Sequence, residues 1–244
     1  MLSKSEVKYI QSLSQKKFRA QAQAYVVEGP KIVAEALLSP LVEVEQVFAL
    51  SGWLEANQKL TKNVSLTVVD EQELQRISQL KTANQALAVV KKNEGNSIVA
   101  DQNAVSLALD GIQDPGNLGT IIRIADWFGI DQVICSEDCA DVYNPKVVQA
   151  SMGSIFRVNM AYVDLKDWLA GKSDVPLFGA ALHGKPLSSF SKLHKGIIVI
   201  GNESKGIRPE ILDLVQEKLT IERRGQAESL NAAVATGIIL SHLV

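Results

Sequence analysis

Three stretches of the chain combine polar side chains with small residues, glycine in two of them and alanine in the third, so that backbone and side chains together can hold a ligand. These stretches are DPGNLGTIIR at 114–123, GNESKG at 201–206 and SLNAAVA at 229–235. The amides of Asn117 and Asn231 can each donate and accept hydrogen bonds, and Glu203 adds a carboxylate. Arg123 adds a planar guanidinium that suits phosphate. Because a turn that leads into a helix often holds a phosphate or a nucleotide, these residue types indicate a ligand of that kind.

Each stretch also has an ordinary structural explanation. Asp126 lies three residues after Arg123 and could form a surface ion pair with it. Glu203 could lie near a helix N-terminus, where a carboxylate is favourable, and Ser229 could simply cap a final core or interface helix. The sequence lacks G-x-G-x-x-G after its first strand and G-x-x-x-x-G-K-[ST] throughout, which counts against a dinucleotide fingerprint and a Walker loop. Taken singly, none of the three stretches identifies a function.

The elements that must position these stretches follow from the hydrophobic pattern, in which strand-like and helix-like segments alternate along the chain. The expected strands are 24–29, 44–50, 65–70, 85–92, 105–112, 132–137, 157–163, 176–182, 196–204 and 218–223. The expected helices are 30–39, 53–60, 71–80, 118–128, 144–156, 164–171, 207–215 and 227–243. Such alternation predicts an α/β fold, and ligands of open α/β sheets bind beyond the carboxyl ends of the strands.

A polar segment rich in Asn, Lys and Gly separates two runs of this pattern. The predicted parts are a small α/β domain at 1–92, a linker at 93–103, and an α/β domain with a mostly parallel sheet at 104–244. Pro30 and Asp70 are expected to begin helices, and Asn117 is expected to cap the helix that follows it. Gly129 is expected to end that helix, whose apolar stripe runs from Leu118 to Ala125.

The composition is that of an ordinary globular protein, with 46% apolar and 21% charged residues. A net charge of −2 gives no overall attraction to nucleic acid, but the first twenty residues carry a net charge of +4, which suits either phosphate contact or a solvated helix. We find no signal-peptide pattern and no apolar stretch long enough to cross a bilayer, so a cytoplasmic protein is expected. Cys135 and Cys139 have no histidine nearby, so reduced thiols and no metal site are expected.

Together and in this order, the three stretches resemble the SpoU branch of the SPOUT RNA methyltransferases, also called the TrmH family. N-L-G-T-I-I-R (117–123) is similar to motif 1, G-N-E-S-K-G (201–206) to motif 2 and S-L-N-A-A-V-A (229–235) to motif 3. Motif 3 commonly reads S-L-N-V-S-V-A, so Ala232 and Ala233 depart from it and could alter the packing of the helix. The first ninety residues resemble the ribosomal-protein-like RNA substrate-binding domain of this family.

The resemblance implies a C-terminal trefoil knot, a homodimer through the C-terminal domain, and S-adenosylmethionine as donor of a methyl group to an RNA ribose 2′-hydroxyl. The residues implied around the reacting hydroxyl are Asn117, Arg123, Glu203, Ser229 and Asn231. Those implied to contact the cofactor are Gly201, Ile221 and Leu230, with Leu182, Ile200 and Gly206 as neighbours. The first domain and its basic end favour 23S rRNA as substrate. A tRNA methyltransferase and a non-catalytic RNA-binding protein of the same fold are the alternatives, and the missing fingerprint disfavours a nicotinamide-dependent oxidoreductase.

The resemblance assigns the role of general base to Arg123, although a guanidinium stays protonated in nearly all proteins. In one hypothesis an RNA phosphate holds Arg123 while desolvation beside the sulfonium lowers its proton affinity. In the other, Arg123 stays charged, clamps a phosphate and stabilises the developing alkoxide while another group or water takes the proton. We prefer the second, with Glu203 orienting Asn231 or Arg123. No metal is needed, because the leaving group is neutral.

Overall fold

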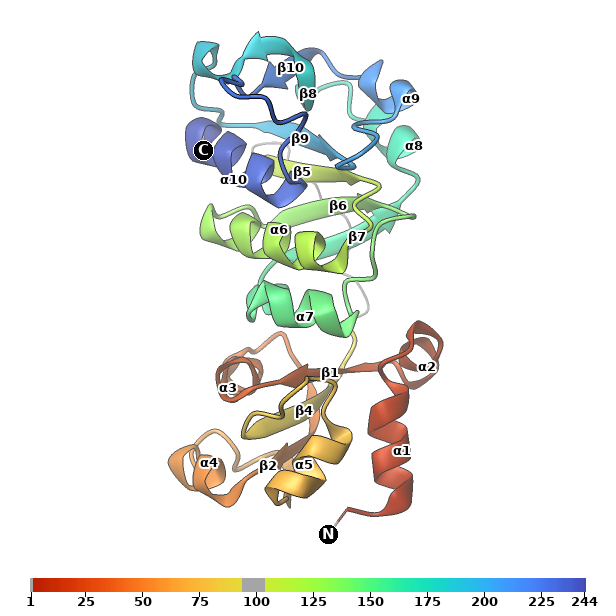
Figure 1. Cartoon of the computed structure of the whole chain (residues 1–244), viewed down its shortest axis with the longest axis vertical. Helices are drawn as coiled ribbons and strands as arrows, with labels where there is room; N and C mark the ends of the chain where they lie inside the picture. The colour runs from red at the N-terminus through yellow and green to blue at the C-terminus, as the bar shows by residue number, and fades with distance from the viewer. Residues whose placement is uncertain (1, 94–103) are drawn as a thin grey trace. The chain divides into compact units, whose positions relative to one another are not determined.

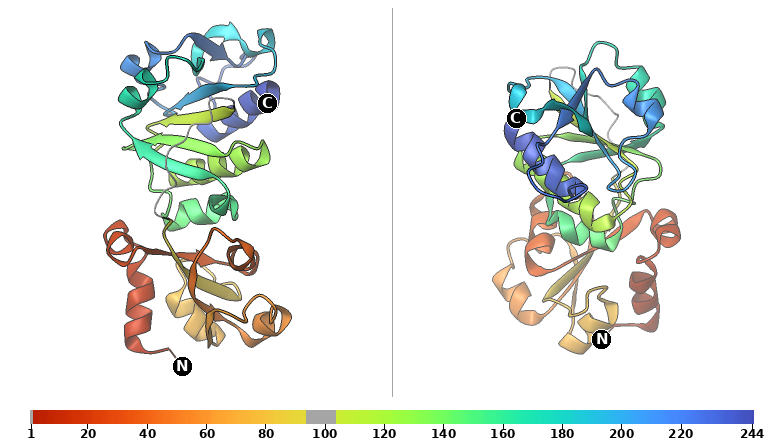
Figure 2. Two further views of the ribbon diagram at one scale, coloured as in Figure 1. Left: turned by 180° about the vertical axis from the view of Figure 1, so that it is seen from behind. Right: turned by 45° about the horizontal axis from the view of Figure 1, so that its top comes forward.

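The structure is a computed structural model that describes residues 2–93 and 104–244 (Figures 1 and 2). The chain divides into two compact units. The first comprises Met1–Glu94 and Tyr143–Phe156, and the second comprises Gly95–Val142 and Arg157–Val244. Of the predicted linker at 93–103, only Asn93 lies within the described residues.

The first unit is a mixed four-stranded sheet with helices around it. Its strands are β1 (Ala24–Glu28), β2 (Val44–Ala49), β3 (Ser65–Val68) and β4 (Ala86–Lys91). Its helices are α1 (Lys4–Ser12), α2 (Lys16–Ala22), α3 (Pro30–Leu38), α4 (Ser51–Ala56), α5 (Glu71–Ile77), α7 (Pro145–Ser151) and the 3₁₀ turn η1 (Ser154–Phe156). In the order β1-β4-β2-β3, β4 is antiparallel to β1 and β2, and β3 is parallel to β2. Because side chains alternate along a strand, Ala88 enters a core with Val33 and Val148, and Leu87 enters a second core with Leu74.

The second unit is built on a six-stranded parallel sheet in the order β10-β8-β9-β5-β6-β7. Its strands are β5 (Val105–Asp110), β6 (Gln132–Ser136), β7 (Asn159–Val163), β8 (Leu177–Pro186), β9 (Gly196–Gly201) and β10 (Glu217–Thr220). Its helices are α6 (Pro115–Trp127), α8 (Leu165–Ala170), the 3₁₀ turn η2 (Leu187–Ser189), α9 (Pro209–Leu212) and α10 (Ala232–Leu243). Leu169 of α8 and Ile211 of α9 pack on Ile197 and Val199 of β9. Helices α6 and α10 lie side by side (Figures 1 and 2).

Helices α6 and α10, which follow the first and third motif stretches, have N-caps other than the predicted residues. Asp114, not Asn117, is the N-cap of α6, because its Oδ1 accepts the backbone N–H of Asn117 at 2.8 Å. Asn231, not Ser229, is the N-cap of α10, and Ser229 lies exposed in the preceding loop. Both predicted caps are wrong. Helix α6 begins at Pro115, before Asn117, and helix α10 begins at Ala232, three residues after Ser229. As a result the Asn117 side chain is available for long-range contacts.

Other local predictions are confirmed. Asp70 caps α5 in a capping box with Glu73, and Pro30 is the first residue of α3. Gly129 follows α6 with a φ of 69°, a left-handed conformation that glycine adopts without strain. The apolar stripe of α6 from Leu118 to Ala125 is fully buried. In the described part of the chain, no helix has the length and apolar character needed to span a membrane.

Candidate functional site

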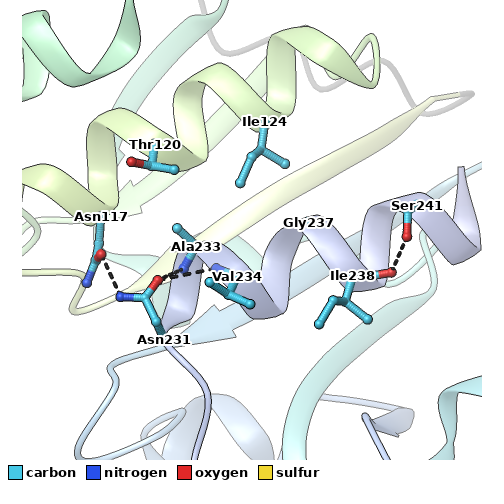
Figure 3. A pocket seen from close by; sticks show the side chains of 9 residues that line it. All are labelled: Asn117, Thr120, Ile124, Asn231, Ala233, Val234, Gly237, Ile238 and Ser241. Carbon is cyan, nitrogen blue, oxygen red and sulfur yellow. Dashed lines mark hydrogen bonds between the residues drawn. The ribbon is translucent and has the colours of Figure 1, made fainter.

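A line of hydrogen bonds joins the three motif stretches. The Asn117 amide nitrogen donates to Glu203 Oε1, and the Asn231 amide nitrogen donates to Asn117 Oδ1 at 2.8 Å (Figure 3). The Asn231 Oδ1 atom accepts the backbone N–H groups of Ala233 at 3.0 Å and Val234 at 3.2 Å, which caps α10. Residues far apart in the sequence therefore meet in one polar cluster within the second unit, as the sequence led us to expect for Asn117, Glu203 and Asn231.

The GNESKG stretch forms a tight loop at the carboxyl end of β9. Asn202 and Gly206 exchange backbone hydrogen bonds of 3.1 and 2.8 Å, and the Asn202 side-chain oxygen accepts the N–H of Ser204 at 2.9 Å. A Cβ added to Gly201 would lie 2.3 Å from the carbonyl carbon of Gly206, so only glycine fits. Gly201 thus permits the loop to fold onto itself.

We expect Gly201→Ala to destabilise the protein by about 1–3 kcal/mol, because the added methyl group overlaps backbone atoms of Gly206 that cannot rotate away. Urea unfolding of the full chain measures this change. Gly225→Ala is the matched control, since a Cβ at this exposed loop position meets nothing within 4 Å. Equal stability of the two variants would contradict the proposed crowding at Gly201.

The end of β5 holds this loop at two points. The Asn202 amide nitrogen donates to the backbone oxygen of Gly111 at 2.8 Å. Asp110, which is 1% exposed, accepts both the backbone N–H and the Nε–H of Arg208 at 2.7 Å. Burial alone would lower the pKa of Arg208, but the charge of Asp110 and its hydrogen bond outweigh burial and raise it. Sequence reasoning missed Asp110, Asn202 and Arg208. The one available signal was an aspartate at the end of an otherwise apolar strand.

Arg123 does not join the hydrogen-bonded cluster. Its side chain is exposed on α6 and makes no hydrogen bond or ion pair with any described residue. The alternative of an Arg123–Asp126 ion pair is wrong, because Asp126 is bound by Arg157 through Nε at 2.9 Å and Nη2 at 2.8 Å. Six residues of helix separate Arg123 from Asn117, about 9 Å along the axis and on a different face. Arg123 is therefore a cation without a polar partner among residues 2–93 and 104–244.

The residues expected at the cofactor lie around the carboxyl ends of three adjacent strands. Ile200 is buried near the end of β9, and Gly201 ends that strand. Ile221 follows β10, and Leu182, in the long β8, is 66% exposed. Gly206 and Leu230 lie in loops, and Leu230 is 44% exposed. Since β10, β8 and β9 are parallel neighbours, these residues share one end of the sheet, where exposed apolar side chains could cover an apolar ligand group.

A groove of about 350 Å³ runs between α6 and α10 (Figure 3). Its lining residues are Asn117, Thr120, Ile124, Asn231, Ala233, Val234, Gly237, Ile238 and Ser241. Val234 is 51% exposed and Ile238 is 37% exposed, so α10 presents apolar side chains beside the polar cluster. Exposed apolar side chains in a groove are typical of a surface that another molecule covers.

The two cysteines lie beside the same end of the sheet. Cys135 in β6 is fully buried, and Cys139 accepts the backbone N–H of Ile112 at 3.2 Å. A hydrogen bond between the two thiols lowers the pKa of Cys139 to about 7 and raises the pKa of Cys135. Across residues 2–93 and 104–244, no three His, Cys, Asp or Glu side chains are grouped so that they could hold a metal ion.

Comparison with known proteins covers nearly the whole chain. A model of the SpoU rRNA Methylase family matches residues 104–241, and a model of the MRM3-like substrate binding domain matches residues 4–88. The chain is 30% identical over 241 residues to the 23S rRNA (guanosine(2553)-2′-O)-methyltransferase RlmP of Bacillus subtilis (strain 168). That similarity covers 98% of this chain and 95% of the relative.

Solved structures of similar proteins share the fold. The SpoU methyltransferase AviRb from Streptomyces viridochromogenes, in complex with the cofactor AdoMet, matches with a TM-score of 0.85 and 26% identity over 98% of this chain and 96% of that one. The AdoMet-bound rRNA methyltransferase from Sinorhizobium meliloti matches with a TM-score of 0.87 and 27% identity over 98% of this chain and 94% of that one. The mixed α/β fold with its parallel sheet matches these methyltransferases, and the chain belongs to the SpoU rRNA methylase family.

Proposed function

We propose that this protein is an S-adenosylmethionine-dependent RNA methyltransferase that modifies a ribose 2′-hydroxyl of 23S rRNA. The observation that carries the proposal is the Asn117–Glu203–Asn231 cluster, which joins the three motif stretches at the carboxyl end of the sheet. The similarity to RlmP supports rRNA as the substrate class, and the AdoMet complexes of AviRb and the Sinorhizobium enzyme support the cofactor.

The cofactor fits the loops at the ends of β8, β9 and β10. The exposed apolar side chains of Leu182 and Leu230 can cover its adenine, and backbone groups at Gly201, Gly206 and Ile221 can bind its polar edges. The side chain of Ile200, directly before the 201–206 loop, is buried and anchors the end of β9. When bound, S-adenosylmethionine supplies a methyl group on a sulfonium, whose neutral leaving group requires no metal.

The protein's own residues would bind and orient the ribose. The linked amides of Asn117 and Asn231 can donate hydrogen bonds to the ribose and accept them from it. Glu203 holds them in place by accepting a hydrogen bond from Asn117. In this proposal Arg123 stays protonated, binds an RNA phosphate through two N–H groups and stabilises the developing alkoxide, while water or another group takes the proton. Ser229, exposed and adjacent in sequence to Leu230, is available to contact the substrate.

We further propose a homodimer through the second unit. The apolar groove between α6 and α10 supports this. Arg123, which has no polar partner among the described residues, lies on the same helix as Thr120 and Ile124 of the groove. We also propose a C-terminal trefoil knot, since β10 lies at one sheet edge whereas α10 returns to α6. The division into a substrate-binding domain at 1–92 and a catalytic domain at 104–244 remains part of the proposal, as does a cytoplasmic location.

We expect Ile238→Glu to convert a dimer into a monomer, because a carboxylate would be desolvated in the groove. Light scattering after size-exclusion chromatography measures the mass. Leu38→Glu, at a 65% exposed position of the first unit, is the control and should stay dimeric. A dimeric Ile238→Glu protein would place the interface elsewhere.

Two measurements test the function itself. Calorimetric titration with S-adenosylmethionine should give saturable binding to the full-length protein, and absence of binding would favour the non-catalytic RNA-binding alternative. Mapping of 2′-O-methyl groups in cellular RNA with and without the gene should reveal one lost site in 23S rRNA. A site lost from tRNA instead would change the substrate class.

A further inference from the structure

The loop at 201–206 is attached to β5 at both of its ends. Before the turn, Asn202 donates its amide N–H to the Gly111 oxygen at 2.8 Å. After the turn, Arg208 donates its backbone N–H and its Nε–H to the two oxygens of Asp110, both at 2.7 Å. Between these anchors, the N–H groups of Ser204 and Lys205 are bound by the Asn202 side chain. The shape of the loop therefore depends on contacts to another strand as well as on its own glycines.

The Asp110–Arg208 ion pair is costly for the fold alone. Asp110 is 1% exposed, and it ends a strand whose other residues bury apolar or small side chains. The Arg208 side chain is 43% exposed, but desolvation of the Asp110 carboxylate still offsets much of the attraction between the charges, so the pair adds little net stability. Such a pair instead fixes orientation, because the guanidinium Nε–H and the backbone N–H of Arg208 can bind the same carboxylate in only one arrangement. This pair lies at the end of the sheet that the cofactor would occupy.

We propose that Asp110 and Arg208 are positioning residues for S-adenosylmethionine, whose ion pair holds the 201–206 loop in its cofactor-binding shape. This inference rests on the proposed function and names residues outside the three motif stretches. Neither side chain forms a hydrogen bond or ion pair with Asn117 or Asn231, all four being described residues, so both act through the backbone of the loop. Loss of the pair should weaken cofactor binding and leave RNA binding and the chemical step largely intact.

The test compares Arg208→Ala, Arg208→Lys and Asp110→Asn with Arg157→Ala. Arg157 is the matched control because it also makes an arginine–aspartate pair in the second unit, with Asp126 at 2.8 Å. Calorimetry with S-adenosylmethionine should show binding about 10- to 100-fold weaker in Arg208→Ala, the loss expected when a charged hydrogen-bond partner is removed. Arg208→Lys keeps the charge and should recover part of the affinity, whereas Arg157→Ala should bind as the wild type does.

Two further readouts separate positioning from general stability. Steady-state kinetics of Arg208→Ala should give a raised KM for S-adenosylmethionine, with kcat and the KM for RNA near wild-type values. Hydrogen exchange in the absence of ligand should show faster exchange at the Ser204 and Lys205 amides. Wild-type cofactor affinity in Arg208→Ala, or a change confined to the KM for RNA through the exposed edge of Arg208, would overturn the inference.

Other outcomes remain decisive. If Arg208→Ala and Asp110→Asn do not fold, Arg208→Lys decides, because it should bind the cofactor a few-fold more weakly and unchanged binding would reject the proposal. If the wild type itself binds no S-adenosylmethionine, the proposed function fails. Exchange at Ser204 and Lys205 then still shows whether the ion pair holds the loop, and unchanged exchange in the variants would reject that part independently.

Discussion

Arg123→Ala is expected to reduce the rate of methyl transfer about 10²- to 10³-fold, the usual effect of removing one group that stabilises charge in the transition state. Its stability should change by no more than about 0.5 kcal/mol, because the side chain is exposed and has no partner among the described residues. Single-turnover methylation of the RNA substrate and urea unfolding measure the two effects. Removal of this side chain should require no repacking, because Arg123 is exposed and forms no hydrogen bond or ion pair within the described part of the chain.

Arg123→Lys tests whether a positive charge alone is sufficient at this position. Lysine keeps the positive charge but loses the planar fork, so turnover should stay well below that of the wild type. Lys166→Ala removes an exposed cation from α8 and so loses the same charge as Arg123→Ala, and this control should leave turnover unchanged. Undiminished turnover of Arg123→Lys would reject both a base role and a phosphate clamp.

Asn231→Ala is expected to lose both stability and activity. The substitution removes the cap of α10, at a cost of about 1 kcal/mol, and also the hydrogen bond to Asn117. Without that bond the Asn117 side chain is held only by its hydrogen bond to Glu203, and misplacement of a positioning group by about 1 Å can reduce the rate about 10²-fold. Thermal or urea unfolding measures the first loss, and single-turnover methylation measures the second.

Asn231→Ser separates the two losses. Serine caps helices about as well as asparagine, so the stability of this variant should approach that of the wild type. It has no amide to donate to Asn117, so the activity should stay as low as in Asn231→Ala. Wild-type turnover in Asn231→Ser would show that Asn231 serves only as a helix cap.

The motif residues can be recognised in the sequence because the three stretches combine specific residue types in a specific order along the chain. Asn117, Glu203 and Asn231 were grouped by three matching stretches, and the structure links them by hydrogen bonds. The hydrogen-bond partners of individual side chains could not be predicted in this way. Asp126 is three residues from Arg123 and is the expected local partner. In the structure Asp126 instead binds Arg157, which lies just before β7.

The sequence is sufficient to predict the family, the α/β alternation with a parallel sheet in the second unit, and the buried stripe of α6. Periodic apolar residues specify local structure, and the residue types and order of the three motif stretches are specific to the family. The sequence is not sufficient to predict the caps of α6 and α10, the attachment of the 201–206 loop by Asp110 and Arg208, or the packing of α7 with the first unit, all of which are seen in the folded structure. These depend on hydrogen bonds and apolar contacts between segments that are remote in sequence, and no local pattern specifies which of several chemically suitable partners will be adjacent after folding.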